Sequence, residues 1–130
     1  LMLADSPASP SRDHTSDGRL EAWEVLDMDI RANIAVLSAC STAGGTGFGE
    51  GVIGLSWSLF AAGASTAVVS HWEVDSASTT SLMIAFHRGL LKDTRASAPE
   101  ALRQAQITML KSSAYRHPFY WAGFVSIGAR

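Results

Sequence analysis

Cysteine is almost absent from this sequence of 130 residues, which contains only one, Cys40. A single cysteine excludes an internal disulfide and a metal site built from several thiolates. Proteins without disulfides are typical of reducing compartments, so we expect a cytoplasmic location. The sequence also lacks a basic segment followed by an apolar run at its start, and we therefore expect no signal peptide within these residues.

Charged side chains are scarce, and no cluster of Lys or Arg occurs anywhere in the sequence. Only 17% of the residues are charged, 47% are hydrophobic, and the formal net charge is -2. Binding to a nucleic-acid backbone requires a basic surface, so nucleic acid is not an expected partner. The high apolar content instead predicts a dry core in one domain or in part of one.

One uncharged stretch, residues 52–70, is nearly long enough to span a bilayer. Several hydroxyl side chains and glycines interrupt it: Ser56, Ser58, Ser65, Thr66, Ser70, Gly54 and Gly63. We therefore expect a buried helix, a stop at Gly63 and a buried strand, with no membrane partner. Glycine suits this stop because a left-handed backbone conformation costs it little.

The hydrophobic pattern and the turn-forming residues predict an alternation of helices and strands. Residues 5–18 are rich in Ser, Pro and Asp and are expected to form a loop. Helices are predicted over 19–27, capped by Asp17, and over 50–62, 76–91 and 99–110. Strands are predicted over 34–39, 66–71 and 119–127. This order predicts an α/β fold with a mostly parallel sheet and helices on both of its faces.

Cys40 follows the apolar run 34–39 and precedes a glycine-rich segment, 43–51. In open α/β sheets, functional groups gather at the carboxyl ends of the strands. Backbone N–H groups in the glycine-rich turn and at the start of the next helix would favour a thiolate and bind an oxyanion. Cys40 is therefore either a nucleophile or a small buried hydrophobe, and the surrounding residues leave both interpretations open.

A glycine-rich turn between a strand and a helix is also typical of nucleotide-binding sites. The glycine spacing here does not fit the dinucleotide pattern GxGxxG, and no lysine follows Gly49 or Gly51 as in a phosphate-binding loop. Glu50 would also repel a phosphate. The sequence therefore disfavours a nucleotide, and we expect no cofactor and no metal.

Four histidines are available as partners of the thiol. Only His71 ends a predicted strand, so it can share the sheet edge with the thiol as a general base. His14 lies in the polar loop, His87 is expected on a helix surface, and His117 precedes a proline in a turn. Trp72, beside His71, is expected to serve in packing rather than recognition.

Five motifs stand out in order along the chain: LSACST at 37–42, GEGVIGL at 49–55, AAGA at 61–64, VVSHWEVD at 68–75 and HPFYWAGF at 117–124. Together they resemble the CHAT domain family. Members of this family are caspase-like cysteine peptidases that are related to separase and often fused to tetratricopeptide repeats. The resemblance extends from about residue 17 to residue 128.

The resemblance implies a caspase-like three-layer sandwich and a Cys–His dyad in which Cys40 is the nucleophile. The histidine of such a dyad comes earlier, as His-Gly at the end of the preceding strand, about 50 residues before the cysteine. Only 39 residues precede Cys40 here, and His14 is followed by Thr15 rather than by glycine. Residues 1–130 are therefore expected to be the C-terminal part of one CHAT domain. The base would lie upstream of the first residue, with His71 as a substitute candidate.

The resemblance also implies that the loop 72–75 helps to form the pocket for the residue before the scissile bond. Glu73 or Asp75 would then select a basic side chain in the substrate. Asp75 has an alternative role as the N-cap of the following helix. The backbone N–H of Cys40 would supply one of two oxyanion donors, and the upstream His-Gly segment the other.

These inferences lead to a bacterial, cytoplasmic cysteine endopeptidase that acts on a protein or a peptide. Its expected partners are the upstream part of the same domain and a repeat domain. Without the upstream histidine, the 130 residues alone are expected to be inactive. The alternative is a non-catalytic CHAT-like protein-interaction module in which the Cys40 side chain only packs.

Overall fold

The structure is a computed structural model that describes residues 20–38, 50–92 and 96–128, apart from the side chains of 50–53. Its elements are, in chain order, helix α1 (Ala22–Leu26), strand β1 (Ile34–Leu37), helix α2 (Glu50–Ala61), strand β2 (Thr66–Ser70), helix α3 (Ser76–Lys92), helix α4 (Ala98–Lys111), the 3-10 turn η1 (Pro118–Tyr120) and strand β3 (Phe124–Gly128). Within the described part, the predicted alternation of helices and strands is confirmed. Cys40, His14 and the segment 5–18 lie outside the described residues.

The three strands form a mixed sheet in the order β1-β2-β3. β1 and β2 are parallel, and their register pairs Leu37 with Val69. β3 is antiparallel to β2 and begins beside its end, where Phe124 pairs with Ser70. The prediction of a mostly parallel sheet is therefore wrong for β3.

The turn before β3 accounts for its antiparallel direction. The strand predicted over 119–127 begins only at Phe124, because η1 comes first. Trp121 and Ala122 both donate backbone hydrogen bonds to the Pro118 carbonyl oxygen, which closes the turn. The chain thus returns to the carboxyl end of β2. From there β3 runs in the opposite direction to β2 and pairs with it.

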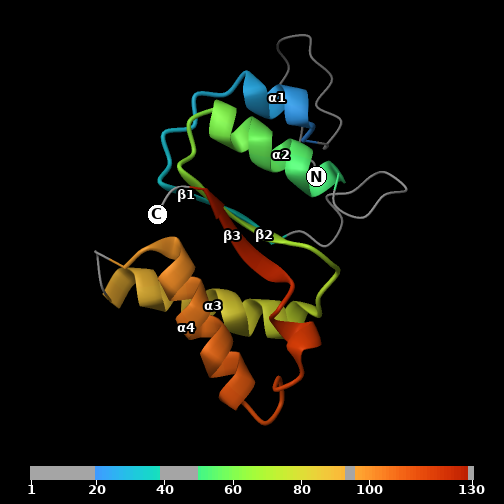
Figure 1. The fold of residues 1–130 in the computed structure, drawn as a ribbon, viewed down its shortest axis with the longest axis vertical. Coiled ribbons are helices and arrows are strands. Elements are labelled where there is room, and N and C mark those ends of the chain that lie inside the picture. Colours follow the sequence, from blue (N-terminus) through green and yellow to red (C-terminus); the bar gives the residue numbers. More distant parts are fainter. Residues whose placement is uncertain (1–19, 39–49, 93–95, 129–130) are drawn as a thin grey trace, which may run out of the picture.

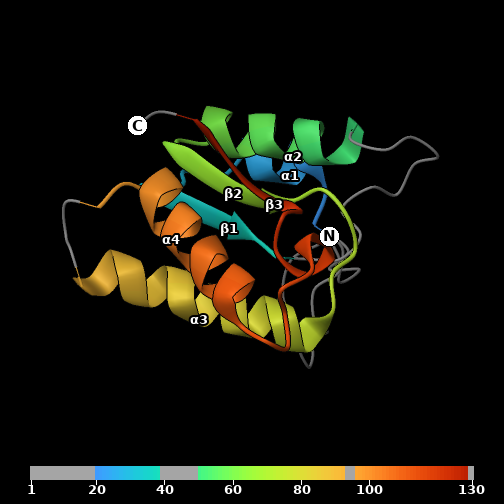
Figure 2. The same ribbon diagram turned by 60° about the horizontal axis from the view of Figure 1, so that its bottom comes forward.

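Helices cover both faces of the sheet, as predicted (Figures 1 and 2). α3 and α4 lie on one face, where Phe86 belongs to the same apolar cluster as Val68. α1 and α2 lie on the other face, where Leu55 and the half-buried Leu37 share a second cluster. β2 is buried throughout because it lies between two strands and two helical layers, whereas every residue of β1 is only half-buried.

α1 is shorter than predicted, and Glu21 rather than Asp17 is its N-cap residue. The Glu24 carboxylate accepts a hydrogen bond of 2.7 Å from the Glu21 backbone N–H, which closes the first turn. Val25 is the buried residue of this helix and packs in the cluster beneath α2. Asp17 itself lies outside the described residues, and the predicted cap is corrected to Glu21.

The uncharged stretch 52–70 folds as predicted, into a helix, a glycine turn and a strand. Gly63 adopts a φ of 108°, and a Cβ atom at this position would lie 2.6 Å from the Ile30 carbonyl oxygen. Ile30 also donates a backbone hydrogen bond to Ala62, so this turn anchors the segment before β1. No helix in the described ranges is long and apolar enough to cross a membrane.

Candidate functional site

The parallel pairing of β1 and β2 brings their carboxyl ends to the same edge of the sheet. Leu37 pairs with Val69, so Ser38 and Ser70 follow at the same level, and His71 comes next. The sequence predicted reactive groups at this edge. Ser38 is the last described residue before Cys40, which lies outside the described residues together with the glycine-rich segment up to 49.

His71 lies directly after β2, and its side chain is exposed. Its backbone N–H donates a hydrogen bond of 2.9 Å to the Gly123 carbonyl oxygen, which extends the contact between β2 and β3. The imidazole makes no hydrogen bond with another described residue, so these residues leave both ring nitrogens available. The position of His71 at the predicted edge is confirmed, while its role as a base stays a prediction.

Glu73 and Asp75, the two predicted selectors of a basic side chain, have different surroundings. The Asp75 carboxylate accepts a hydrogen bond of 2.9 Å from the Ser78 backbone N–H, and the Ser78 hydroxyl donates to the Asp75 carbonyl oxygen. Asp75 is therefore the N-cap of α3, the alternative role that the sequence allowed. Glu73 is exposed and has no hydrogen-bond or ion-pair partner among the described residues.

The loop after β2 is held by contacts with the segment before β3. The Ser70 hydroxyl donates to the Trp72 carbonyl oxygen at 2.6 Å, and the Trp72 indole N–H donates to the Phe119 carbonyl oxygen at 3.1 Å. Gly123 packs so closely on the indole that an added Cβ atom would lie 2.8 Å from Cε2. The predicted packing role of Trp72 is confirmed, yet 36% of the residue remains exposed.

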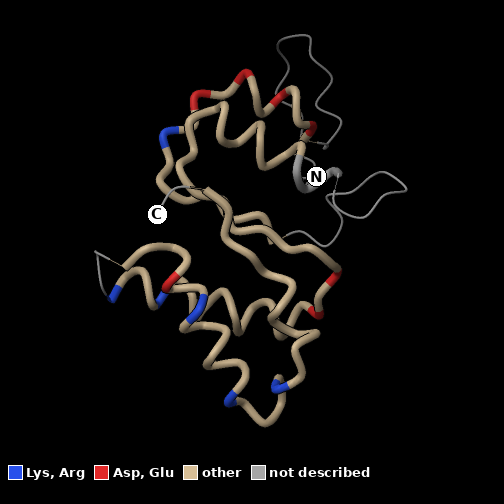
Figure 3. The backbone as a smooth tube through the Cα atoms, viewed as in Figure 1, with Lys and Arg blue, Asp and Glu red and all other residues tan. Residues whose placement is uncertain are grey.

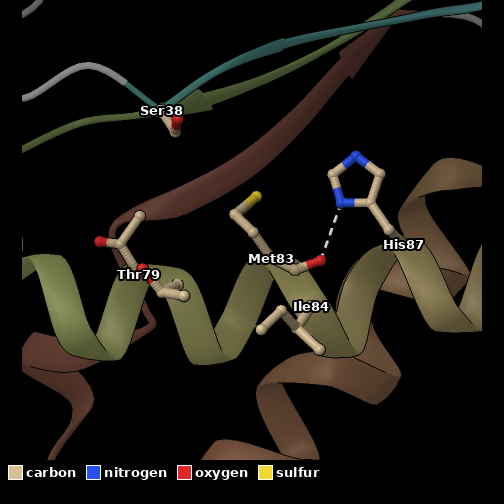
Figure 4. A pocket seen from close by; sticks show the side chains of 6 residues that line it. Ser38, Thr79, Met83, Ile84 and His87 are labelled. Atoms are coloured by element: carbon tan, nitrogen blue, oxygen red, sulfur yellow. Dashed lines mark hydrogen bonds between the residues drawn. The ribbon is translucent and has the colours of Figure 1, made fainter.

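A groove with a volume of about 420 Å³ lies between the end of β1 and one side of α3 (Figure 4). Its lining residues are Ser38, Thr79, Thr80, Met83, Ile84 and His87. His87 is exposed, as the sequence predicted, but it also shares this groove with the last described residue before the thiol. The sequence analysis did not predict that His87 lies at this groove. The signal for it was the four-residue spacing of Thr79, Met83 and His87, which puts them on one face of a helix.

The imidazole of His87 has a defined hydrogen-bonding state. Its Nδ1 atom lies 2.8 Å from the Met83 carbonyl oxygen, the contact drawn as a dashed line in Figure 4. A carbonyl oxygen can only accept a hydrogen bond, so Nδ1 carries the proton and Nε2 keeps a lone pair in the neutral ring. Nε2 is thus the ring atom of His87 that can accept a proton.

His14 and His117 are the other two histidines of the sequence. His117 accepts a hydrogen bond of 3.2 Å on Nδ1 from the Phe119 backbone N–H, which confirms its predicted place in a turn. His14 lies outside the described residues. Within 20–38, 50–92 and 96–128, no group of three or more His, Cys, Asp or Glu side chains could hold a metal ion.

Charge is distributed unevenly over the described surface (Figure 3). Acidic residues lie on and around α1 and in the loop of Glu73 and Asp75, and Glu100 lies on α4. Apart from Arg31, the described Lys and Arg residues lie on α3, on α4 and in the segment after α4: Arg88, Lys92, Arg103, Lys111 and Arg116. No Lys or Arg occurs in the sequence between Arg31 and Arg88, so Glu73 and Asp75 have no basic neighbour within their own loop.

Comparisons with known proteins give one family and two relatives. A family model described as CHAT domain matches residues 1–129. Tetratricopeptide repeat protein 28 of Homo sapiens is 36% identical over 110 residues, which cover 85% of this chain and 4% of that protein. Tetratricopeptide repeat protein 28 of Mus musculus is 34% identical over 110 residues, with the same coverage. The chain thus spans 4% of the length of these curated relatives. No solved structure matches it.

Proposed function

Because this chain belongs to the CHAT domain family, we propose that it forms part of a cysteine endopeptidase in which Cys40 is the nucleophile. One observation carries the proposal: β1 and β2 are parallel and end at the same edge, with Ser38 and His71 just beyond them. Cys40 follows Ser38 by two residues, and each residue advances the chain by about 3.8 Å at most. Under the proposal, the Cys40 thiol therefore acts close to the carboxyl edge of the sheet.

In the proposed reaction, the thiol proton of Cys40 passes to a histidine, and the thiolate attacks the carbonyl carbon of the peptide bond. The Cys40 backbone N–H and a donor from the upstream segment stabilise the oxyanion. The histidine then gives the proton to the leaving amine, the C–N bond breaks, and a thioester remains on Cys40. Water hydrolyses the thioester and restores the thiol.

The general base is proposed to be a histidine of a His-Gly segment upstream of this sequence, in the same domain. Under this assignment, the 130 residues alone lack the base and are inactive. Among the described residues, two histidines are substitute candidates. His71 is exposed at the sheet edge, and His87 keeps a lone pair on Nε2 in the groove that Ser38 lines.

Substrate selection is proposed to favour a basic side chain, and Glu73 is the stronger candidate for selecting it. Its exposed carboxylate has no partner among the described residues, whereas the Asp75 carboxylate already caps α3. A carboxylate without an internal partner can pair with a substrate cation at no cost in lost contacts. The substrate class is therefore a protein or a peptide with a basic residue before the scissile bond.

The wider protein is proposed to carry tetratricopeptide repeats, because both relatives are named for them. A caspase-like layering is proposed for the complete domain, in which the upstream part would extend the sheet. The described sheet supports this proposal, because helices cover both of its faces (Figure 2). A cytoplasmic location remains part of the proposal. A bacterial source has no support from these relatives, which are human and mouse proteins.

The proposal is tested with the full-length protein and a peptide library that contains basic residues. Cys40→Ala should abolish cleavage while the circular dichroism spectrum and the melting temperature stay unchanged. His71→Ala and His87→Ala should each keep most of the activity, because the base lies upstream. Cleavage by the Cys40→Ala variant would end the peptidase proposal, and loss of cleavage in one histidine variant alone would transfer the role of base to that residue.

The alternative function is a non-catalytic interaction module in which Cys40 only packs. Alkylation by iodoacetamide separates the two functions, because the thiolate is the reactive form of cysteine. A cysteine beside a catalytic histidine has a lowered pKa and is therefore more often a thiolate at neutral pH. Labelling of Cys40 in the full-length protein that is faster than that of a free thiol at pH 7 supports a nucleophile. Labelling at the free-thiol rate or below supports the interaction module.

A further inference from the structure

The outer face of α3 combines apolar and basic side chains. Ile84, Arg88 and Leu91 follow one another at steps of four and three residues, so they lie on one face of the helix, with Lys92 beside them. Ile84 is 46% exposed, Leu91 is 82% exposed, and both basic residues are exposed. We call these four residues the α3 ridge. α3 contains no acidic residue, and neither basic side chain has an ion-pair partner among the described residues.

The core and α4 contact other sides of α3. Leu82 and Phe86, which are fully buried, pack toward the sheet. α4 approaches α3 at Gly89, where an added Cβ atom would lie 3.5 Å from the Cβ atom of Ala101. Successive residues of a helix are about 100° apart, so both contacts lie away from the α3 ridge. In the described part of the chain, the α3 ridge is therefore an outer surface.

A second surface, at α1 and just after it, combines apolar and acidic side chains. Trp23 is 61% exposed, Leu26 is 52% exposed and Met28 is 43% exposed. Trp23 and Leu26 are three residues apart on α1 and therefore share one face of it. Asp27 and Asp29, both exposed, flank Met28 in the sequence. We call these five residues the α1 face.

Trp23 is positioned before any partner binds. Its indole N–H donates a hydrogen bond of 2.8 Å to the Glu21 carboxylate. Val25, the buried residue of α1, packs in the same cluster as Leu55 of α2, which holds the helix against its neighbour. A ring with a hydrogen-bond partner loses less side-chain freedom on binding, and exposed tryptophans often dominate the binding energy of an interface.

The two surfaces differ in charge and lie on opposite sides of the sheet (Figures 1 and 3). Residues 1–75 contain ten of the 12 acidic residues, and residues 76–130 contain seven of the ten Lys and Arg residues. Asp27 has no partner among the described residues, and Asp29 pairs with Arg31 at 2.9 Å in an exposed ion pair. Because the sheet separates them, the α3 ridge and the α1 face cannot meet within one copy of the chain.

We propose that the α3 ridge of one copy binds the α1 face of a second copy. A second copy is the fitting partner because the chain itself carries the complementary surface. The exposed apolar side chains form the centre of this contact, and Arg88 and Lys92 face the carboxylates of Asp27 and Asp29. The contact joins two different surfaces, so copies associate head to tail into rings or chains. The inference goes beyond the proposed peptidase function and is independent of it.

The test measures the mass of the full-length protein by sedimentation velocity over a range of concentrations. Wild type should associate as its concentration rises, and high NaCl should weaken the association because it screens the charges. The ridge variant carries Arg88→Glu with Lys92→Glu, and the α1 variant carries Asp27→Lys with Asp29→Lys. Each should raise the dissociation constant by about tenfold or more, because like charges then meet.

Mixing the two double variants is the sharpest part of the test. In the mixture, the acidic ridge of one variant meets the basic α1 face of the other, so opposite charges face each other again. The mixture should therefore associate, although neither variant associates alone at the same concentration. A loss of association through damage to some other surface is not restored by mixing.

Matched controls keep this role apart from net charge and from general hydrophobicity. Lys111→Glu with Arg116→Glu changes the net charge as much as the ridge variant does, but outside the α3 ridge, and should associate as wild type does. Leu91→Gln should weaken the association. Leu110→Gln, at a residue of α4 that is 45% exposed, should leave it unchanged. Thermal unfolding checks that each variant is folded.

The outcomes decide between a second copy and another partner. Loss of association in both double variants, with recovery on mixing, supports the inference whether or not the protein cleaves peptides. A wild type that stays monomeric at every concentration overturns it and assigns the α3 ridge to a different acidic protein or to solvent. Association that persists in either double variant, or that does not return on mixing, also overturns it.

Discussion

Gly123 leaves room for the indole of Trp72, because a Cβ atom at this position would lie 2.8 Å from the Cε2 atom of the ring. This contact joins the loop after β2 to the segment before β3, two parts of the chain that are far apart in sequence. The hydrogen bond from the Trp72 indole N–H to the Phe119 carbonyl oxygen joins the same two parts. The geometry of the candidate site therefore depends on a residue that has no chemistry of its own.

Replacing Gly123 should test this dependence directly. Gly123→Ala should destabilise the protein by about 1 to 3 kcal/mol, because the added methyl group overpacks a ring that is hydrogen-bonded in place. The measurement is the free energy of unfolding in urea. Gly54→Ala is the matched control, since an added Cβ at Gly54 meets nothing within 4 Å in α2. The control should be neutral or stabilising by about 0.5 to 1 kcal/mol, and equal effects of the two substitutions would contradict the packing argument.

The two acidic residues of the loop should respond differently to substitution. Asp75→Ala should lower the free energy of unfolding by about 1 kcal/mol, because the Ser78 N–H loses its cap acceptor. Glu73→Ala should change it by less than about 0.5 kcal/mol, since its exposed carboxylate has no described partner. Urea unfolding of both variants measures the difference. A larger loss of stability for Glu73→Ala would show that its carboxylate is structural.

The core between the sheet and α3 should be sensitive at Phe86. This side chain is fully buried in the cluster with Val68 and Phe124, so Phe86→Ala should cost about 3 to 5 kcal/mol. Ile84, two residues earlier on α3, is 46% exposed, and Ile84→Ala should cost less than about 1 kcal/mol. Chemical denaturation measures both costs. Comparable values would mean that α3 packs by a different face.

The pH dependence of stability should contain a small contribution from Glu100. The hydrogen bond from Arg103 lowers the pKa of this carboxyl, with a second contribution from Gln104. A folded-state pKa below the ordinary 4.5 stabilises the protein above pH 4.5, and this stabilisation is lost as the pH falls through the lowered pKa. The difference in urea midpoint between wild type and Glu100→Gln should therefore be largest near neutral pH and shrink in acid. A difference that grows on acidification would reverse the assigned sign.

Much of the local structure could be predicted from the sequence, because it depends on neighbouring residues. The apolar run 34–39 and the stretch 52–70 predicted β1, α2 and β2, and Gly63 was predicted at the turn where its backbone is left-handed. Asp75 was predicted as a candidate N-cap of α3, and the Ser78 contact confirms it. The location of the candidate site at the carboxyl end of β1 followed from the same local patterns.

The sequence alone determined the order of the elements, the family and the identity of the candidate nucleophile, Cys40. Only the tertiary structure decided that β3 runs antiparallel to β2, that His87 shares a groove with Ser38, and that Gly123 and Phe119 immobilise the Trp72 indole. Local patterns report the periodicity of a helix or a strand. They do not report which distant segments meet, because such contacts arise only when the whole chain packs.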